Sequence, residues 1–151
     1  MIKLSTGLRQ ALLGTNDFKT IFTDSVLEIY SGSAPATADD AETGMKLCRI
    51  TVSSGAFTAG TATAGLEFGT PSAGVIAKAS AEVWSGVNLA TGTAGYYRLY
   101  ANAYGTGSST SHVRLQGTVG TSGADMTVAS TAFTSGATTT VDTFSITLPA
   151  A

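Results

Sequence analysis

Residues 96–104, YYRLYANAY, and residues 112–119, HVRLQGTV, decide the fold of this chain. In the second stretch apolar and polar residues alternate: Val113, Leu115 and Val119 share one face, while Arg114 and Gln116 share the other. Alternation over this length is typical of a half-buried β-strand. The connection between the stretches begins with GTGSST (residues 105–110), which suits a hairpin-type turn. We therefore predict two neighbouring strands, with the polar face of the second turned to solvent.

Segments before and after these two stretches also alternate between apolar and polar residues. Residues 26–30 (VLEIY) and 47–52 (LCRITV) are the clearest, and each ends at a Ser-Gly pair or shortly before one. Shorter or less regular strands are expected over residues 66–68, 74–79, 81–87, 126–128 and 141–148. In the last of these, Phe144, Ile146 and Leu148 should face inward. About eight or nine short strands joined by Gly-rich turns predict an all-β domain, a β-sandwich or jelly roll, over residues 25–151.

The composition favours an assembly component. Thr, Ala, Gly and Ser make up 82 of the 151 residues, and charged residues only 12%, about half the ~25% usual for soluble domains. Depletion of charge is typical of surface that is buried in an interface. A net charge of −2 with scattered basic residues excludes an electrostatic footprint for nucleic acid. No apolar run is long enough for a membrane-spanning helix, so we expect neither nucleic acid nor membrane as a partner.

The first 24 residues have a different pattern and predict a helical arm. Leucines recur every four positions from residue 4 to residue 12, and Gly14 suits the end of a helix. Asn16 or Asp17 could cap a second helical turn. The arm either packs over its own domain or docks against a neighbouring subunit. In the docking arrangement the apolar contacts come from Leu8, Leu12, Phe18 and Phe22.

The residues suited to nucleophilic catalysis are few. The one histidine, His112, is expected on the polar face of its strand as a surface residue. The one cysteine, Cys48, shares an apolar face with Ile50 and Val52, where burial raises a thiol pKa and makes the group inert. We therefore expect no catalytic residues.

A long loop over residues 33–44 carries the densest group of acidic residues, Asp39, Asp40 and Glu42. Carboxylates suit calcium, but their spacing does not match an EF-hand loop. We expect a solvated contact loop, with no metal and no cofactor bound to the chain.

The aromatic residues of the first stretch are candidates for an interface. Tyr96 and Tyr100 lie on one face of the predicted strand and Tyr97 on the other. Core packing together with a subunit interface at Tyr96 and Tyr100 is our prediction. A stacking platform for sugar, built with Trp84, is the alternative.

Four segments resemble small virion-associated proteins of tailed bacteriophages. They are LSTGLRQALLG (residues 4–14), VLEIYSGSAP (26–35), WSGVNLATGTAG (84–95) and TVGTSGAD (118–125). The resemblance covers composition and phrasing over most of the chain and includes no active-site motif, so no functional residues are transferred.

The resemblance implies a non-enzymatic structural protein of the virion, made in the host cytoplasm. The expected role is a capsid decoration (cement) protein that stabilises the head lattice. Its expected partners are further copies of itself, as a homotrimer, and the major capsid protein or another virion protein. The alternative is a tail or baseplate component, including a receptor-binding one. A carbohydrate-active enzyme is a third possibility, although Glu28, Glu67 and Glu82 have no spacing typical of paired catalytic carboxylates.

Overall fold

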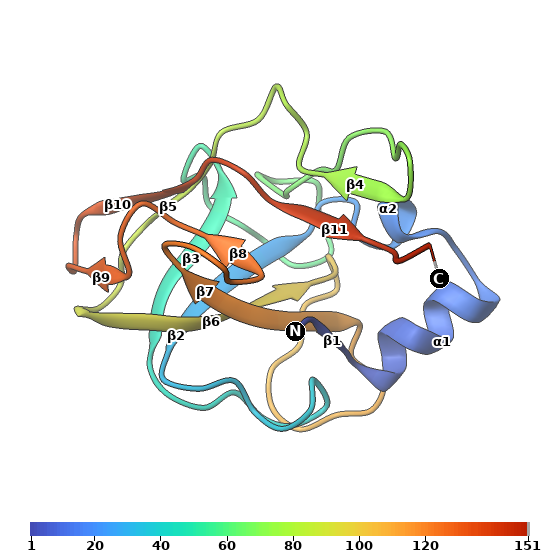
Figure 1. Cartoon of the computed structure of the whole chain (residues 1–151), viewed down its shortest axis with the longest axis horizontal. Coiled ribbons are helices and arrows are strands. Elements are labelled where there is room, and N and C mark those ends of the chain that lie inside the picture. Colours follow the sequence, from blue (N-terminus) through green and yellow to red (C-terminus); the bar gives the residue numbers. More distant parts are fainter. Residues whose placement is uncertain (151) are drawn as a thin grey trace.

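The computed structural model describes residues 1–150 (Figure 1). It consists of two mainly antiparallel sheets and two short helices. The helices are α1 (Thr6–Gly14) and α2 (Phe18–Ile21). The strands are β1 (Lys3–Leu4), β2 (Val26–Ser31), β3 (Lys46–Val52), β4 (Val75–Ala77), β5 (Trp84–Val87), β6 (Gly92–Tyr100), β7 (Arg114–Gly120), β8 (Met126–Thr127), β9 (Ala132–Phe133), β10 (Thr138–Val141) and β11 (Ser145–Thr147). The predicted all-β domain with a short N-terminal helix is confirmed.

The large sheet has the strand order β1-β7-β6-β2-β3-β5-β10, with β8 beside β7 and β9 beside β6. Its register places Leu27 opposite Ile50 on one side and Leu99 on the other. Leu99 in turn faces Leu115 on β7. Because side chains alternate along a strand, these pairs form one continuous apolar face. All four residues are buried.

The small sheet, β4 with β11, packs over this apolar face and gives the domain a sandwich-like arrangement. Ile76 of β4 and Ile146 of β11 belong to the same core cluster as the leucines of the large sheet. An aromatic group fills the space between the sheets: the Phe144 ring packs in tilted or edge-on contacts against Phe68, Trp84 and Tyr97 at centroid distances of 6.1, 5.6 and 5.3 Å. The core is therefore closed by two sheets of very different size.

The N-terminal segment shares this core. Ser5 caps α1 by accepting a hydrogen bond from the Leu8 N–H, and Asp17 caps α2 in the same way through Thr20. Leu8 and Phe22 are fully buried in the core cluster. Strand β1 also pairs with β7. Residues 1–24 thus pack over their own domain, and a boundary at residue 24 does not separate two independent cores.

Several strand predictions differ from the structure. Residues 66–68 form isolated bridges to Ser25 and Lys78 rather than a strand. The predicted strand over residues 141–148 is wrong, because β10 ends at Val141 and β11 begins at Ser145 in the other sheet. Phe144 and Ile146 do face inward, but Leu148 is 75% exposed. Strand β6 runs from Gly92 to Tyr100, so the predicted strand over residues 96–104 begins too late and extends too far.

Candidate functional site

The polar face of the large sheet is buried, which corrects the prediction that it is turned to solvent. Glu28, Arg98, Arg114 and Gln116 are all fully buried. They lie on adjacent strands, since Arg98 is opposite both Glu28 and Gln116. The segment between β2 and β3, residues 32–45, lies over this face and is called the covering loop below. A second loop, residues 101–113, adjoins it.

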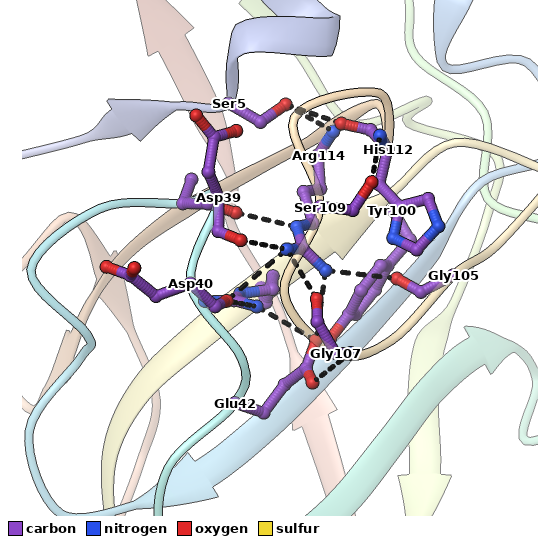
Figure 2. Close-up of polar contacts among 12 residues, drawn as sticks. Ser5, Asp39, Asp40, Glu42, Tyr100, Gly105, Gly107, Ser109, His112 and Arg114 are labelled. Carbon is purple, nitrogen blue, oxygen red and sulfur yellow. Dashed lines mark hydrogen bonds and ion pairs between the residues drawn. The ribbon is translucent and has the colours of Figure 1, made fainter.

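Arg114 binds both loops to the sheet (Figure 2). All three guanidinium nitrogens donate hydrogen bonds, and most acceptors are backbone carbonyls. The acceptors are the carbonyl oxygens of Ala38 (2.6 Å), Gly107 (2.8 Å), Asp39 (2.9 Å), Gly105 (3.2 Å) and Asp40 (3.3 Å), and Oε1 of Glu42 (3.3 Å). Burial and the nearby Arg98 charge lower the pKa of the guanidinium. A buried charge of this kind is tolerated only when its donors are satisfied, and here the backbone of the two loops satisfies them.

Arg98 and Gln116 extend the same arrangement. Arg98 donates two bonds to Oε1 of Gln116, from Nη2 at 2.6 Å and Nε at 3.2 Å, and one to the Asp40 carbonyl at 3.0 Å. The Gln116 amide then donates to the carbonyl of Pro35 at 2.8 Å. Three side chains of β6 and β7 therefore hold the covering loop along much of its length.

Glu42 is the carboxylate that both arginines share. Its Oε1 lies 2.8 Å from Nη1 of Arg98 and 3.3 Å from Nη1 of Arg114, and it also accepts the Tyr100 hydroxyl at 2.8 Å. Its Oε2 accepts the Gly107 N–H at 2.8 Å. Burial opposes the charged form, but these hydrogen bonds and the Arg98 charge outweigh it and lower the pKa of Glu42. We call Arg98, Arg114, Gln116 and Glu42 the loop clamp.

A second charged group lies beside the clamp on β2 and β3. Oε1 of the buried Glu28 pairs with Lys46 at 2.8 Å and with Arg49 at 2.7 Å. Its Oε2 accepts the Tyr30 hydroxyl at 2.5 Å, and Tyr30 is linked to Tyr100 at 3.0 Å. Burial and the Glu28 charge raise the pKa of Tyr30 far above its usual value. The two charged groups are thus joined through a pair of neutral phenols.

The chemistry of this face is structural. The charged atoms of the clamp are directed at protein acceptors and donors under the covering loop, so they fix backbone rather than face a ligand. Asp39 and Asp40 hold neighbouring turns: Asp39 accepts from Thr6 and Asp40 from Thr37. Within residues 1–150 no group of three or more His, Cys, Asp or Glu side chains is arranged to hold a metal ion.

Cys48 and His112 are far apart. Cys48 is buried on the apolar side, and burial raises the pKa of its thiol to about 12. His112 precedes β7 and is half-buried, with its ring against Gly105 and its Nδ1 without a hydrogen-bond partner in the described part of the chain. The prediction of a surface histidine on the strand is therefore wrong. Strands β3 and β7 are separated by β2 and β6, about 14 Å at the usual strand spacing.

The predicted interface residues separate into two groups. Leu8 and Phe22 are in the core, and Tyr96 and Tyr100 are buried beneath the covering loop, where the Tyr96 hydroxyl donates to the Thr43 carbonyl. Their burial within their own chain removes these four from a subunit interface in this conformation. Tyr97 and Trp84 are buried too, so none of these four aromatic residues, Trp84, Tyr96, Tyr97 and Tyr100, presents an open ring face for a sugar. Leu12 and Phe18 are only partly buried.

Leu12 and Phe18 line an apolar groove of about 450 Å³. Its walls come from β1, α1, α2 and the β4–β11 sheet. The apolar side chains of its lining include Ile2, Leu4, Leu12, Phe18, Ile146 and Leu148. Sequence reasoning found Leu12 and Phe18, but it missed the contribution of the C-terminal strand.

Comparisons with protein-family models, curated proteins and solved structures found no match. No helix within residues 1–150 is long and apolar enough to cross a membrane.

Proposed function

We propose that this chain is a non-enzymatic structural protein of a tailed-phage virion, most specifically a decoration protein that stabilises the head lattice. The virion assignment comes from the resemblance of the four segments described above. The surface of the domain supports an assembly role, because it has few charges and exposes large apolar side chains. These are Met1, Leu4, Leu13, Met45, Val83, Val87, Leu89 and Leu148.

The loop clamp fits such a role. Long loops ordinarily lose conformational freedom when they bind, and this loss weakens binding. Here Arg98 and Arg114 already fix the covering loop in the free chain. A subunit with loops ordered in advance can present them to a lattice at little further entropic cost. On this proposal the protein acts in the virion beside the major capsid protein, as a homotrimer.

A tail or baseplate component is the competing proposal. Its only support in the sequence was the tyrosine-rich strand as a receptor-binding surface. Because Tyr96, Tyr97 and Tyr100 are buried, that support is lost, and the head is the location we propose.

Co-sedimentation tests the proposal. Heads and tails of the phage that encodes the chain, prepared without it, are mixed separately with the purified protein. We expect saturable binding to heads at a fixed number of copies per lattice unit, and heads that resist heat better when the protein is bound. Binding to tails alone would favour the competing proposal, and binding to neither particle would refute a virion role. Light scattering of the free protein separates a trimer from a monomer.

A further inference from the structure

We propose that the apolar groove between β1 and β11 binds an extended, uncharged apolar peptide segment of a partner protein by strand addition. The inference does not depend on the virion proposal, because it concerns the chemistry of the groove alone. It rests on the two strand edges that border the groove, on its lining and on its size.

Both strands that border the groove are edge strands. Strand β1 is the outermost strand at one end of the large sheet, where it pairs only with β7. Strand β11 has β4 as its single neighbour in the small sheet. In an antiparallel edge strand every second residue directs its N–H and C=O away from the partner strand. Two sets of backbone groups are therefore open at the groove.

The hydrogen bonds identify the open groups. The Ser5 N–H donates to the Arg114 carbonyl, so Leu4, one residue earlier, directs its backbone groups away from β7. On β11, the Phe144 carbonyl accepts from Lys78 and the Leu148 N–H donates to Gly74. The residues between them, Ser145 and Thr147, consequently direct their backbone groups away from β4.

The lining selects an uncharged apolar occupant. Leu4 is 37% exposed and Leu148 is 75% exposed, and both border the groove. Among residues 1–150, two charged residues lie at its edge, Asp17 and Lys19. The Asp17 carboxylate is already bound by the N–H and hydroxyl of Thr20 as the cap of α2. An apolar strand gains burial here, whereas a charged one would lose its hydration against a lining that is uncharged apart from Asp17 and Lys19 at the edge.

The size of the groove favours a peptide segment over a second folded copy of this chain. Roughly three apolar side chains fill about 450 Å³, and together they bury on the order of 300–500 Å². Each partner of a standard protein interface buries ~800 Å². Two folded copies would need more surface than the groove provides. An extended segment needs less, because backbone hydrogen bonds supply part of its affinity.

The open backbone groups also favour a peptide over a lipid or another apolar small molecule. A hydrocarbon chain would cover the N–H and C=O groups of Leu4 and Thr147 without offering them partners. Covering polar groups in this way is unfavourable. A peptide strand satisfies them while its alternate side chains enter the groove.

The test uses the isolated, full-length protein and a panel of capped hexapeptides in which Val, Leu or Ile alternates with Thr. A matched panel has Asp at the apolar positions. In ¹⁵N NMR titrations we expect shift changes for the first panel only, centred on the amides of Leu4 and Thr147. Those two amides should also become protected from hydrogen exchange. No binding by any apolar peptide, or equal binding of the Asp panel, would overturn the proposal.

Three variants separate strand addition from other modes of binding. Leu148→Glu places a charge at the groove, and Thr147→Pro removes an N–H that β4 does not use; each should weaken peptide binding at least tenfold. Leu13→Glu alters a residue that is 90% exposed outside the groove lining and should leave binding unchanged. Circular dichroism and thermal melting confirm that each variant is folded.

Two results would point to a different occupant. If decanoate binds the groove, the peptides do not, and Thr147→Pro has no effect, the groove is a site for apolar small molecules. If the peptide-free protein shows concentration-dependent shifts at the groove that Leu148→Glu abolishes, the occupant is a second copy of the chain. Either result overturns the proposal.

Discussion

Replacing Arg114 with methionine tests whether the loop clamp stabilises the fold. Methionine preserves most of the length of the side chain but removes every donor. Six acceptors lose their bond to Arg114, five of them backbone carbonyls of the two loops. The Asp40 carbonyl keeps Arg98 and the Asp39 carbonyl keeps the Ser109 N–H. Glu42 keeps Arg98, Tyr100 and the Gly107 N–H. The expected damage is therefore concentrated where the loops contact β7.

The magnitude follows from comparison with other buried ion pairs. Removing one partner of such a pair costs about 3–5 kcal/mol. Summing six separate hydrogen bonds to a charged group would give far more, but the loops can relax and admit water, so the lower figure applies. That loss is a large part of the ~5–15 kcal/mol that holds a typical domain together. For a chain of this length it corresponds to a fall in Tm of ~6–20 °C.

Arg9→Met is the matched control. Arg9 is exposed and its side chain donates to the Thr6 hydroxyl, so the same substitution should change the free energy of unfolding by no more than ~0.5 kcal/mol. Urea denaturation gives both values, and hydrogen exchange shows whether residues 33–44 open first in Arg114→Met. A loss below ~1 kcal/mol, or exchange in that loop equal to wild type, would show that Arg114 does not hold the loops on β7.

Three other predictions concern a helix, an acid transition and a thiol. Gly7→Ala should destabilise the protein by ~1–3 kcal/mol, because an added Cβ would lie 2.5 Å from the Ser111 carbonyl oxygen. In the same helix an added Cβ at Gly14 meets no atom within 4 Å, so Gly14→Ala should stabilise the protein by ~0.5–1 kcal/mol. Urea denaturation in which both variants are stabilised, or both destabilised, would contradict this packing. Because the pKa of Glu42 is lowered from 4.5, its stabilising contribution is complete above that pH and is lost as pH falls below it. Glu42→Gln should therefore be less stable than wild type at pH 7 and lose less stability between pH 5 and pH 3. If the free energies of unfolding of the two proteins fall in parallel over this pH range, Glu42 is not the group responsible. With a thiol pKa of about 12, Cys48 should resist Ellman's reagent at pH 8 until the protein is unfolded, and rapid labelling of the native protein would show that the site is open.

The elements that the sequence predicted well depend on local signals. Alternating residues defined β2 and β3 almost to the residue, and Asp17 proved to be the cap of α2. These features arise from side-chain periodicity and from hydrogen bonds between near neighbours, both of which a linear sequence contains. The break after Val141 was missed because no Gly or Pro interrupts the apolar pattern between β10 and β11.

The buried polar face could not be predicted from alternation alone. A period of two separates two faces of a strand, but it does not say which one a loop will cover. The signal that was available lay in neighbouring strands: Glu28, Arg98 and Arg114 all occupy the same side as tyrosines. The groove is harder still, since Leu4 and Leu148 are 144 positions apart and meet only in the folded chain.

Electron cryomicroscopy of the intact phage particle tests the central claim, that this chain is an assembly subunit of the head. We expect density for the β-domain at regularly repeated positions on the head surface, with exposed apolar residues such as Leu13 and Leu89 facing neighbouring subunits. A complete head reconstruction with no density for this chain, in particles produced while it is being expressed, would contradict the claim.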